Sequence, residues 1–182
     1  MTGGLVSVVM PAFDEERFIA EALESVFSQT YSSFELIVVD DGSTDHTATV
    51  AGAFDGVRIV RRTTRGGPAA ARNSGLAEAR GEYWTIFDAD DLMPPGRLAL
   101  QVAFLRANPS LDMVLGLAEA FVSPGERRPS HWNPAWDAGP YHGHPGTGLA
   151  RRAVLDQVGA FWAEQLGSFK AQAERGRRPK RS

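Results

Sequence analysis

The chain has 182 residues, no cysteine, and 22 acidic against 19 basic side chains, for a formal net charge of −3. The missing cysteines exclude disulfide bonds, Cys-ligated zinc and thiol catalysis. No apolar run reaches the roughly 18 residues of a membrane span, and the N-terminus lacks the basic and apolar regions of a signal peptide. We therefore expect a cytoplasmic protein with no integral membrane segment and no nucleic-acid partner.

Four short apolar runs predict buried β-strands in the first half of the chain. They occupy residues 6–10, 34–39, 57–60 and 83–87, and Pro11 ends the first of them. Near-continuous apolar character is typical of strands that are covered on both faces of a parallel sheet.

Helical patterns lie between these runs. The apolar residues of 18–27 recur at helical spacing, and Thr44 or Asp45 can cap a short helix after the second strand. Pro68 begins an alanine-rich helix that extends to about Arg80. Alternating strands and helices indicate a Rossmann-like α/β fold, with a mostly parallel central sheet flanked by helices.

The second half of the sequence is less regular. We expect a helix over 95–108, one or two strands within 111–122, and a long loop over 123–148. Two more helices are predicted over 151–158 and 163–174.

Acidic residues follow three of the predicted strands. They lie in the segments 11–14, 40–41 and 88–91. Parallel strands end at the same edge of a sheet, where α/β proteins bind their ligands. Carboxylates this close repel one another, and Asp88 and Asp90 suit Mg²⁺ or Mn²⁺ bound together with a diphosphate. An acidic turn or helix cap is the alternative for any single segment, but the convergence of all three favours a metal site.

Several phosphate-binding classes do not fit. The chain has no Gly-x-Gly-x-x-Gly after the first strand and no Gly-Lys-Ser/Thr loop, which argues against dinucleotide and P-loop proteins. Haloacid dehalogenase-type phosphatases place their aspartate loop on the first strand and follow it with Gly-Thr, unlike residues 87–90. Sugar-nucleotidyltransferases begin with a glycine-rich basic loop, which residues 11–15 lack.

The ordered motifs resemble those of family 2 glycosyltransferases with the GT-A fold. The resemblance covers roughly the first hundred residues and returns later, through segments 6–15, 28–31, 34–45, 70–75, 81–83, 88–91, 148–155 and 158–161. It implies a metal-dependent transfer of a sugar from a nucleotide diphosphate sugar, with UDP-sugar the expected donor, to an acceptor hydroxyl. The family usually inverts the anomeric centre.

The resemblance also implies roles for individual residues. Donor-binding residues would be Pro11, Ala12, Asp14, Asp40, Asp41, Arg72 and Asp88, and the Mn²⁺ or Mg²⁺ ligands would be Asp88 and Asp90. Pro11 and Asp14 would border the nucleoside, and Asp41 would accept a hydrogen bond from the base or ribose. Asp40 would either join them or brace the turn. Arg72 would lie near the diphosphate, and Asp88 would reach the ribose or the metal.

The catalytic base is where the chain departs from the family. Family members usually carry an acidic pair shortly after a Gly-x-Phe segment, but here Gly159-Ala160-Phe161 leads to Ser168-Phe169. Three explanations stay open. Glu164, or else Asp137 or Glu174, acts as the base; the protein binds donor but transfers the sugar poorly; or the chain is truncated. Glu164 is also compatible with a solvent-facing helix position.

These patterns divide the chain into three expected parts. Residues 1–100 form the donor-binding subdomain, 101–169 a shortened acceptor-side subdomain, and 170–182 a basic, frayed tail. The acceptor would be a saccharide, a lipid-linked compound or another hydroxyl compound. The tail's alternative role is contact with anionic lipid at the inner membrane surface, or with polyphosphate.

Overall fold

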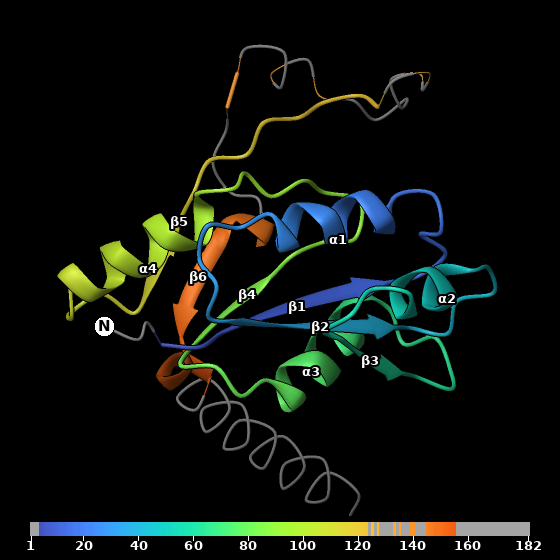
Figure 1. Cartoon of the computed structure of the whole chain (residues 1–182), viewed down its shortest axis with the longest axis horizontal. Helices are drawn as coiled ribbons and strands as arrows, with labels where there is room; N and C mark the ends of the chain where they lie inside the picture. Colours follow the sequence, from blue (N-terminus) through green and yellow to red (C-terminus); the bar gives the residue numbers. More distant parts are fainter. Residues whose placement is uncertain are drawn as a thin grey trace, which may run out of the picture.

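The fold is built around one six-stranded sheet in the order β3-β2-β1-β4-β6-β5 (Figure 1). A computed structural model describes residues 4–123, 125, 127, 133, 135, 139–140 and 145–155. The strands are β1 (Val6–Ala12), β2 (Phe34–Asp40), β3 (Val57–Arg61), β4 (Tyr83–Ile86), β5 (Met113–Leu115) and β6 (Gly148–Arg151). The helices are α1 (Ile19–Phe27), α2 (Thr47–Gly52), α3 (Pro68–Glu78), α4 (Arg97–Ala107) and the 3-10 turn η2 (Pro145–Thr147).

The first four strands are parallel, as the sequence predicts. β1 lies at the centre of this group and pairs with β2 on one side and β4 on the other, and β3 extends the sheet beyond β2. β6 runs antiparallel to both β4 and β5. The carboxyl ends of β1, β2 and β3 point the same way, to the right in Figure 1, so the loops that follow them meet at one edge.

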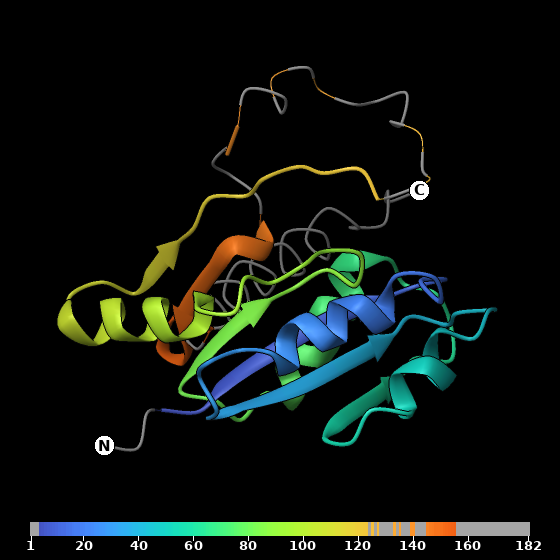
Figure 2. The same ribbon diagram turned by 45° about the horizontal axis from the view of Figure 1, so that its top comes forward.

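Helices cover both faces of the sheet (Figure 2). Alternate residues of each strand point to opposite faces. Val8 and Met10 of β1 pack with α1, α2 and α4 in the larger core cluster. Val9 packs in a second cluster on the other face, together with Ile37 and Ala71 of α3. Burial on both sides explains why the strands read as continuous apolar runs.

The prediction that Pro11 ends the first strand is wrong. β1 continues through Pro11 to Ala12, with Pro11 in register with Val39 of β2. The carbonyl oxygen of Val9 accepts a hydrogen bond from Phe87 on the β4 side. Because hydrogen-bonding groups alternate sides along a strand, the missing N–H of Pro11 also faces that side. β4 has already ended there at Ile86, so the strand loses no ladder bond.

The second half follows the prediction only in part. α4 lies within the predicted helix, and its residues Leu98, Val102 and Leu105 are buried as expected. Of the segment 111–122, only β5 is a strand. β6 was not predicted, because it spans four residues between a predicted loop and a predicted helix. Its backbone is extended by pairing with β4 and β5, which a local pattern does not reveal.

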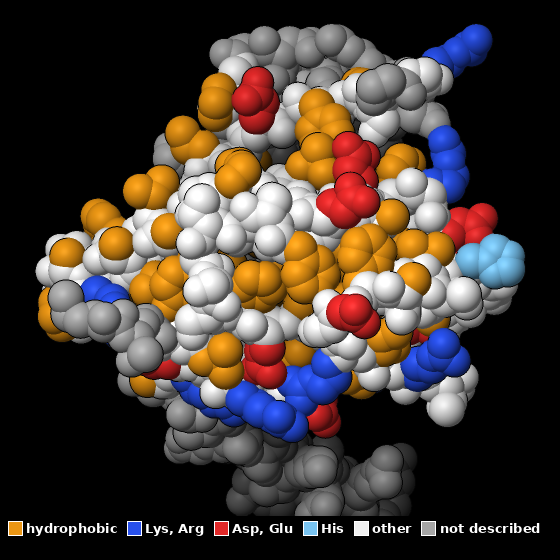
Figure 3. Space-filling model, in the orientation of Figure 1, with side chains coloured by type: hydrophobic (Ala, Val, Ile, Leu, Met, Phe, Trp, Pro, Cys, Tyr) orange, Lys and Arg blue, Asp and Glu red, His pale blue; other side chains and the backbone are white. Residues whose placement is uncertain are grey.

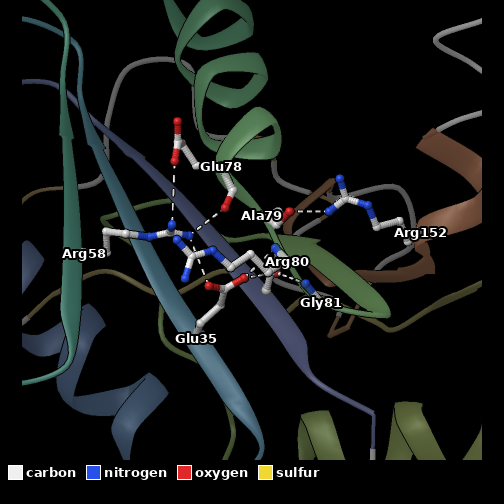
Figure 4. Close-up of polar contacts among 8 residues, drawn as sticks. Glu35, Arg58, Glu78, Ala79, Arg80, Gly81 and Arg152 are labelled. Atoms are coloured by element: carbon white, nitrogen blue, oxygen red, sulfur yellow. Dashed lines mark hydrogen bonds and ion pairs between the residues drawn. The ribbon is translucent and has the colours of Figure 1, made fainter.

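The amino edge of the sheet carries a connected set of polar side chains (Figure 4). The Ser7 hydroxyl donates to Glu35 over 2.5 Å and accepts from the Gly81 N–H over 2.8 Å. Arg58 pairs with the Glu35 carboxylate at 3.0 Å. A Cβ on Gly81 would lie only 2.5–2.7 Å from three backbone atoms, so the chain needs glycine here. These contacts fix the turn before β4.

Large apolar side chains remain exposed around α4 and β5. Leu100 is 73% exposed although its neighbours Leu98 and Leu105 are fully buried. Figure 3 shows hydrophobic side chains gathered over α4, at the left of the view. Other exposed large hydrophobic residues in this region are Phe104, Leu111, Met113, Leu115, Leu117 and Phe121. Within the part of the chain that the structure describes, no helix is both long and apolar enough to cross a bilayer.

Candidate functional site

A cleft of about 300 Å³ lies where the carboxyl ends of the parallel strands meet. The loops after β1, β2 and β4 contribute to it, together with the loop that leads into α3. Its lining residues are Pro11, Ala12, Phe13, Glu15, Asp41, Arg65, Gly67, Pro68, Ala71, Arg72, Asp88, Ala89 and Asp90. Two guanidinium groups and four carboxylates therefore share one cleft, which is the composition expected of a site for a charged ligand.

The loop after β1 is fastened to the loop after β2. The N–H and hydroxyl of Thr44 donate to the Asp14 carboxylate, over 2.7 and 3.3 Å. In turn, the Asp14 N–H donates to Ser43, and the Glu15 N–H donates to Thr47 over 2.7 Å. Asp14 has a φ of 55°, an uncommon value for a residue other than glycine. The two loops thus hold this backbone conformation from both sides.

Asp41 braces the loop before α3. It is buried, and its carboxylate accepts hydrogen bonds from three donors: Arg62 at one oxygen, the Gly67 N–H at the other, and the Gly66 N–H shared between both. Burial alone would raise the pKa of Asp41, but these donors lower the pKa below its usual value. The neighbouring Asp40 accepts from the Ser43 N–H over 2.9 Å and so braces the turn after β2.

Arg72 lies at the opposite end of the cleft. Its terminal nitrogen pairs with Asp88 at 3.0 Å. Its Nε is buried and has no hydrogen-bond partner. One turn later in α3, a Cβ on Gly75 would overlap the side chain of Val9. The helix therefore packs tightly on β1, and this packing holds Arg72 at the cleft. A buried guanidinium donor without a protein partner is a suitable contact for an anionic ligand.

Glu15 adds a negative group between the two ends. Burial and the nearby Asp90 carboxylate raise the pKa of Glu15 to about 7, with further contributions from Asp45, Asp14 and Asp88. Asp90 itself is exposed. The cluster is therefore short of positive charge, even though Arg72 offsets Asp88.

These residues fit a divalent ion that is coordinated partly by protein carboxylates and partly by the phosphates of a bound substrate. Among the described residues, no three acidic or histidine side chains converge into a complete metal cage. Mg²⁺, however, usually binds through one or two carboxylates, substrate phosphates and water. The exposed Asp90 and the unpaired Nε of Arg72 line the same cleft and suit that arrangement, because both could contact the same phosphate groups.

The structure brings most of the predicted site residues together. Pro11, Ala12, Asp41, Arg72, Asp88 and Asp90 line the cleft. Asp14 and Asp40 do not line it and instead fix its loops. Glu164 lies outside the described residues, as do the alternatives Asp137 and Glu174.

Sequence reasoning missed seven lining residues, of which three, Phe13, Glu15 and Arg65, have aromatic or charged side chains. Phe13 and Glu15 belong to the same motif as Pro11, but their types alone suggest a core and a surface position. Arg65 precedes a pair of glycines and gave no signal of its own. Only the tertiary arrangement, in which Asp41 fastens the following glycines, places Arg65 at the cleft.

A mostly parallel sheet with a charged cleft at its carboxyl edge defines an α/β protein whose ligand site lies where this class binds its ligands. Comparison with known families is more specific. The model of the family described as glycosyl transferase family 2 matches residues 7–163. The chain therefore belongs to this family, and its sheet and flanking helices are those of the GT-A fold.

Individual relatives agree with this assignment. Glycosyltransferase GlyG of Streptococcus pneumoniae is 41% identical over 93 residues, covering 49% of this chain and 31% of that protein. The mannosyltransferase PcManGT of Pyrobaculum calidifontis, solved with GDP-Man and Mn²⁺, superposes with a TM-score of 0.68 at 26% identity, over 86% of this chain and 47% of that one.

A third relative was solved with another donor. TarS of S. aureus, in complex with UDP-GlcNAc, gives a TM-score of 0.67 at 27% identity and covers 84% of this chain and 46% of its own. The chain thus spans less than half the length of each of these three relatives.

Proposed function

We propose that the chain forms the donor-binding part of an inverting glycosyltransferase, which moves a sugar from a nucleotide diphosphate sugar to an acceptor hydroxyl. UDP-sugar is the first donor to test. The observation that carries the proposal is Arg72, whose Nε is buried and unpaired in the cleft beside Asp88. Two solved relatives bound to UDP-GlcNAc and GDP-Man support it by similarity.

We infer the direction of the donor from the strand order. The loops that carry Asp41 and Arg65 follow β2 and β3, whereas Asp88 and Asp90 follow β4 on the other side of β1. Arg72 and the β4 carboxylates suit the diphosphate and its metal. Phe13 then suits the flat face of the base at the opposite end. The donor would therefore lie across the end of β1.

The residues at the β4 end have separate tasks. Asp90 would hold a Mn²⁺ or Mg²⁺ ion directly, with Asp88 ligating it or the ribose. When bound, the ion would stabilise the negative charge that grows on the departing nucleoside diphosphate. Arg72 would bind the phosphate oxygens, and Asp88 would orient the Arg72 guanidinium through their 3.0 Å pair. Fixed positions of these groups lower the barrier by orienting the donor.

A general base must remove the proton of the acceptor hydroxyl. We assign this role to Glu164, with Asp137 and Glu174 as alternatives. The acceptor would be a saccharide, a lipid-linked compound or another hydroxyl compound. A second candidate function is a module that binds nucleotide sugar without efficient transfer, because Ser168-Phe169 stands where the family has an acidic pair. Loss of transfer in Glu164→Gln with unchanged donor binding would favour the enzyme.

Calorimetry with UDP, GDP and dTDP, each with and without Mn²⁺, tests the donor site. We expect Mn²⁺ to tighten binding of at least one of them tenfold or more, since the ion bridges the carboxylates and the diphosphate. Asp90→Asn should remove the Mn²⁺ effect. Asp55→Asn, the same change at an exposed residue outside the cleft, should leave it intact. If Mn²⁺ enhances the binding of none of these nucleotides, the proposal is wrong.

A further inference from the structure

We propose that Gln29 is a positioning residue for the metal site, because it holds the segment that follows Asp88 and Asp90 from outside the cleft. The inference rests on the proposed function and adds to it a residue that does not line the cleft. Gln29 lies two residues after α1 and is only 8% exposed. A buried amide needs partners for its polar atoms, and these partners show what Gln29 holds.

Both polar atoms of the Gln29 amide bind the segment after the metal carboxylates. Its Nε2 donates to the carbonyl oxygens of Pro94, over 2.7 Å, and Met93, over 3.3 Å. Its Oε1 accepts from the Leu98 N–H over 3.0 Å, in the first turn of α4. The first N–H groups of a helix have no partner within the helix, so Gln29 supplies one. A single side chain therefore joins the end of α1 to the whole stretch from Met93 to Leu98.

Two neighbours of Gln29 hold the same segment. The Met93 N–H donates to the Ser25 hydroxyl over 3.0 Å. The Thr30 N–H donates to the Pro95 carbonyl oxygen over 2.8 Å. Figures 1 and 2 show this segment passing beside α1 on its way from β4 to α4. Both backbone polar groups of Met93 are thus bound by side chains at the end of α1.

The held segment begins only three residues after Asp90. On the other side of the metal carboxylates, the Phe87 N–H donates to the Val9 carbonyl oxygen over 2.9 Å. The carboxylates therefore lie between two fixed points, Phe87 and Met93. Asp88 also has an ion pair to hold it, whereas Asp90 is exposed. Because three residues span at most about 10 Å, the position of Asp90 depends on where Met93 is held.

This anchor matters because the site gathers like charges. Asp88, Asp90 and Glu15 line the same cleft, and their carboxylates repel one another while no ion is bound. A segment that was free to move would spread them apart, and the ion would then have to order the segment on binding. With Met93 held by Gln29 and its neighbours, the carboxylates stay within reach of one ion. The fold thus orders the site before the ion arrives.

The ratio of nucleotide affinities with and without Mn²⁺, measured by calorimetry, tests this role. Among UDP, GDP and dTDP, we would use the nucleotide with the largest ratio. In Gln29→Leu we expect the ratio to fall about fivefold or more, because the ion must then order the segment that carries its ligands. The affinity without Mn²⁺ should stay unchanged, since Gln29 does not line the cleft.

Two serines at the end of α1 give a matched pair of milder variants. The hydroxyls of Ser25 and Ser28 each donate to the carbonyl oxygen three residues earlier, and Ser25 also accepts from the Met93 N–H. Ser25→Ala should therefore lower the ratio, whereas Ser28→Ala should leave it unchanged. If Gln29→Leu does not fold, this pair of variants decides.

Hydrogen exchange in the metal-free protein gives a readout that does not involve the ion. The Met93 amide should exchange about fivefold faster in Ser25→Ala and at an unchanged rate in Ser28→Ala. Ser7→Ala controls for lost stability, because Ser7 is fully buried at the amino edge, and this variant should keep the full Mn²⁺ ratio. A residue that only stabilised the fold would lower the unfolding midpoint in urea and leave the ratio as it is.

Unchanged ratios in Gln29→Leu and Ser25→Ala would overturn the role of Gln29, and so would an equal fall in Ser7→Ala. In either case the Mn²⁺ effect of the unchanged protein would stand, and the proposed function with it. If Mn²⁺ enhances the binding of no nucleotide to the unchanged protein, the proposed function fails and the inference fails with it.

Discussion

The two edges of the central sheet use the same kinds of side chain with opposite results. At the amino edge, Ser7, Glu35 and Arg58 satisfy one another through short contacts (Figure 4). At the carboxyl edge, Arg72 keeps a buried nitrogen without a partner, and Glu15 has its pKa raised to about 7. A saturated polar network stabilises a fold, whereas an unsatisfied one is available to a ligand.

Composition alone does not distinguish the edges. Glu35 and Asp88 both pair with an arginine at 3.0 Å. The difference lies in what surrounds each pair. Glu35 also accepts from the Ser7 hydroxyl and the Arg80 N–H, while Asp88 has further carboxylates for neighbours. We therefore expect substitutions at the amino edge to lower stability and substitutions at the carboxyl edge to lower binding.

The largest effect on stability is expected for Gly81→Ala at the amino edge. The new Cβ would lie 2.5 Å from the Tyr83 carbonyl oxygen and 2.7 Å from the Ser7 nitrogen. Because backbone must move, we expect a loss of about 3 kcal/mol in the free energy of unfolding, measured by urea denaturation. Gly52→Ala is the control, since its Cβ would meet only Ile59, at 3.5 Å. Equal stabilities of the two variants would contradict the close packing.

Ser7→Ala should lower the free energy of unfolding by about 1–3 kcal/mol. Ser7 is fully buried, and its loss leaves the Gly81 N–H and the Glu35 carboxylate without their shared partner. Ser28→Ala removes an exposed hydroxyl that donates to a backbone carbonyl and should cost much less. Affinity for UDP with Mn²⁺ should stay unchanged in both variants. A loss of affinity in Ser7→Ala would break the division between the edges.

Arg72→Met and Arg58→Met make the comparison direct. Arg72 pairs with Asp88 at a partly exposed position, so we expect its loss to change stability by less than about 1 kcal/mol. Binding of pyrophosphate with Mn²⁺ should nevertheless disappear. Arg58→Met should lower the unfolding midpoint in urea, because Arg58 pairs with two carboxylates, Glu35 and Glu78, and also donates to the Glu78 carbonyl. It should preserve pyrophosphate binding, because Arg58 does not line the cleft. The opposite pattern in the two variants would refute the assignment.

The smallest effect concerns the pH dependence of stability. The folded protein raises the pKa of Glu15 to about 7, above that of an unfolded chain. The folded state therefore binds more protons between about pH 4.5 and 7, and stability should fall by about 1 kcal/mol as the pH rises through this range. Glu15→Gln should flatten this part of the curve, measured as melting temperature against pH without metal. An unchanged slope would show that Glu15 is not responsible.

The sequence predicted the first half of the fold well, because strands buried on both faces carry a strong apolar signal. The predicted strands over 34–39, 57–60 and 83–87 differ from β2, β3 and β4 by a single residue at one end. β6 escaped prediction because pairing with β4 and β5, rather than its own composition, makes its four residues extended. Pro11 was misread because the end of β4 beside it depends on tertiary structure.

The site was predictable where it depends on strand ends. Asp41, Asp88 and Asp90 follow predicted strands, and the structure places all three on the cleft. The sequence did not reveal that both oxygens of Asp41 accept hydrogen bonds from the protein. Nor did it reveal the contact between Phe13 and Arg65, residues 52 positions apart that meet only after the sheet has formed.

Hydrogen bonds run in both directions between the loops after β1 and β2, and they limit how the lengths of these loops can vary within the family. Asp14 accepts from Thr44 while Glu15 donates to Thr47, and Glu16 both donates to Asp45 and accepts from His46. An insertion in either loop would put every one of these pairs out of register at once. Length changes should therefore be tolerated poorly at these two loops, and donor preference should diverge by side-chain replacement on backbones of constant length.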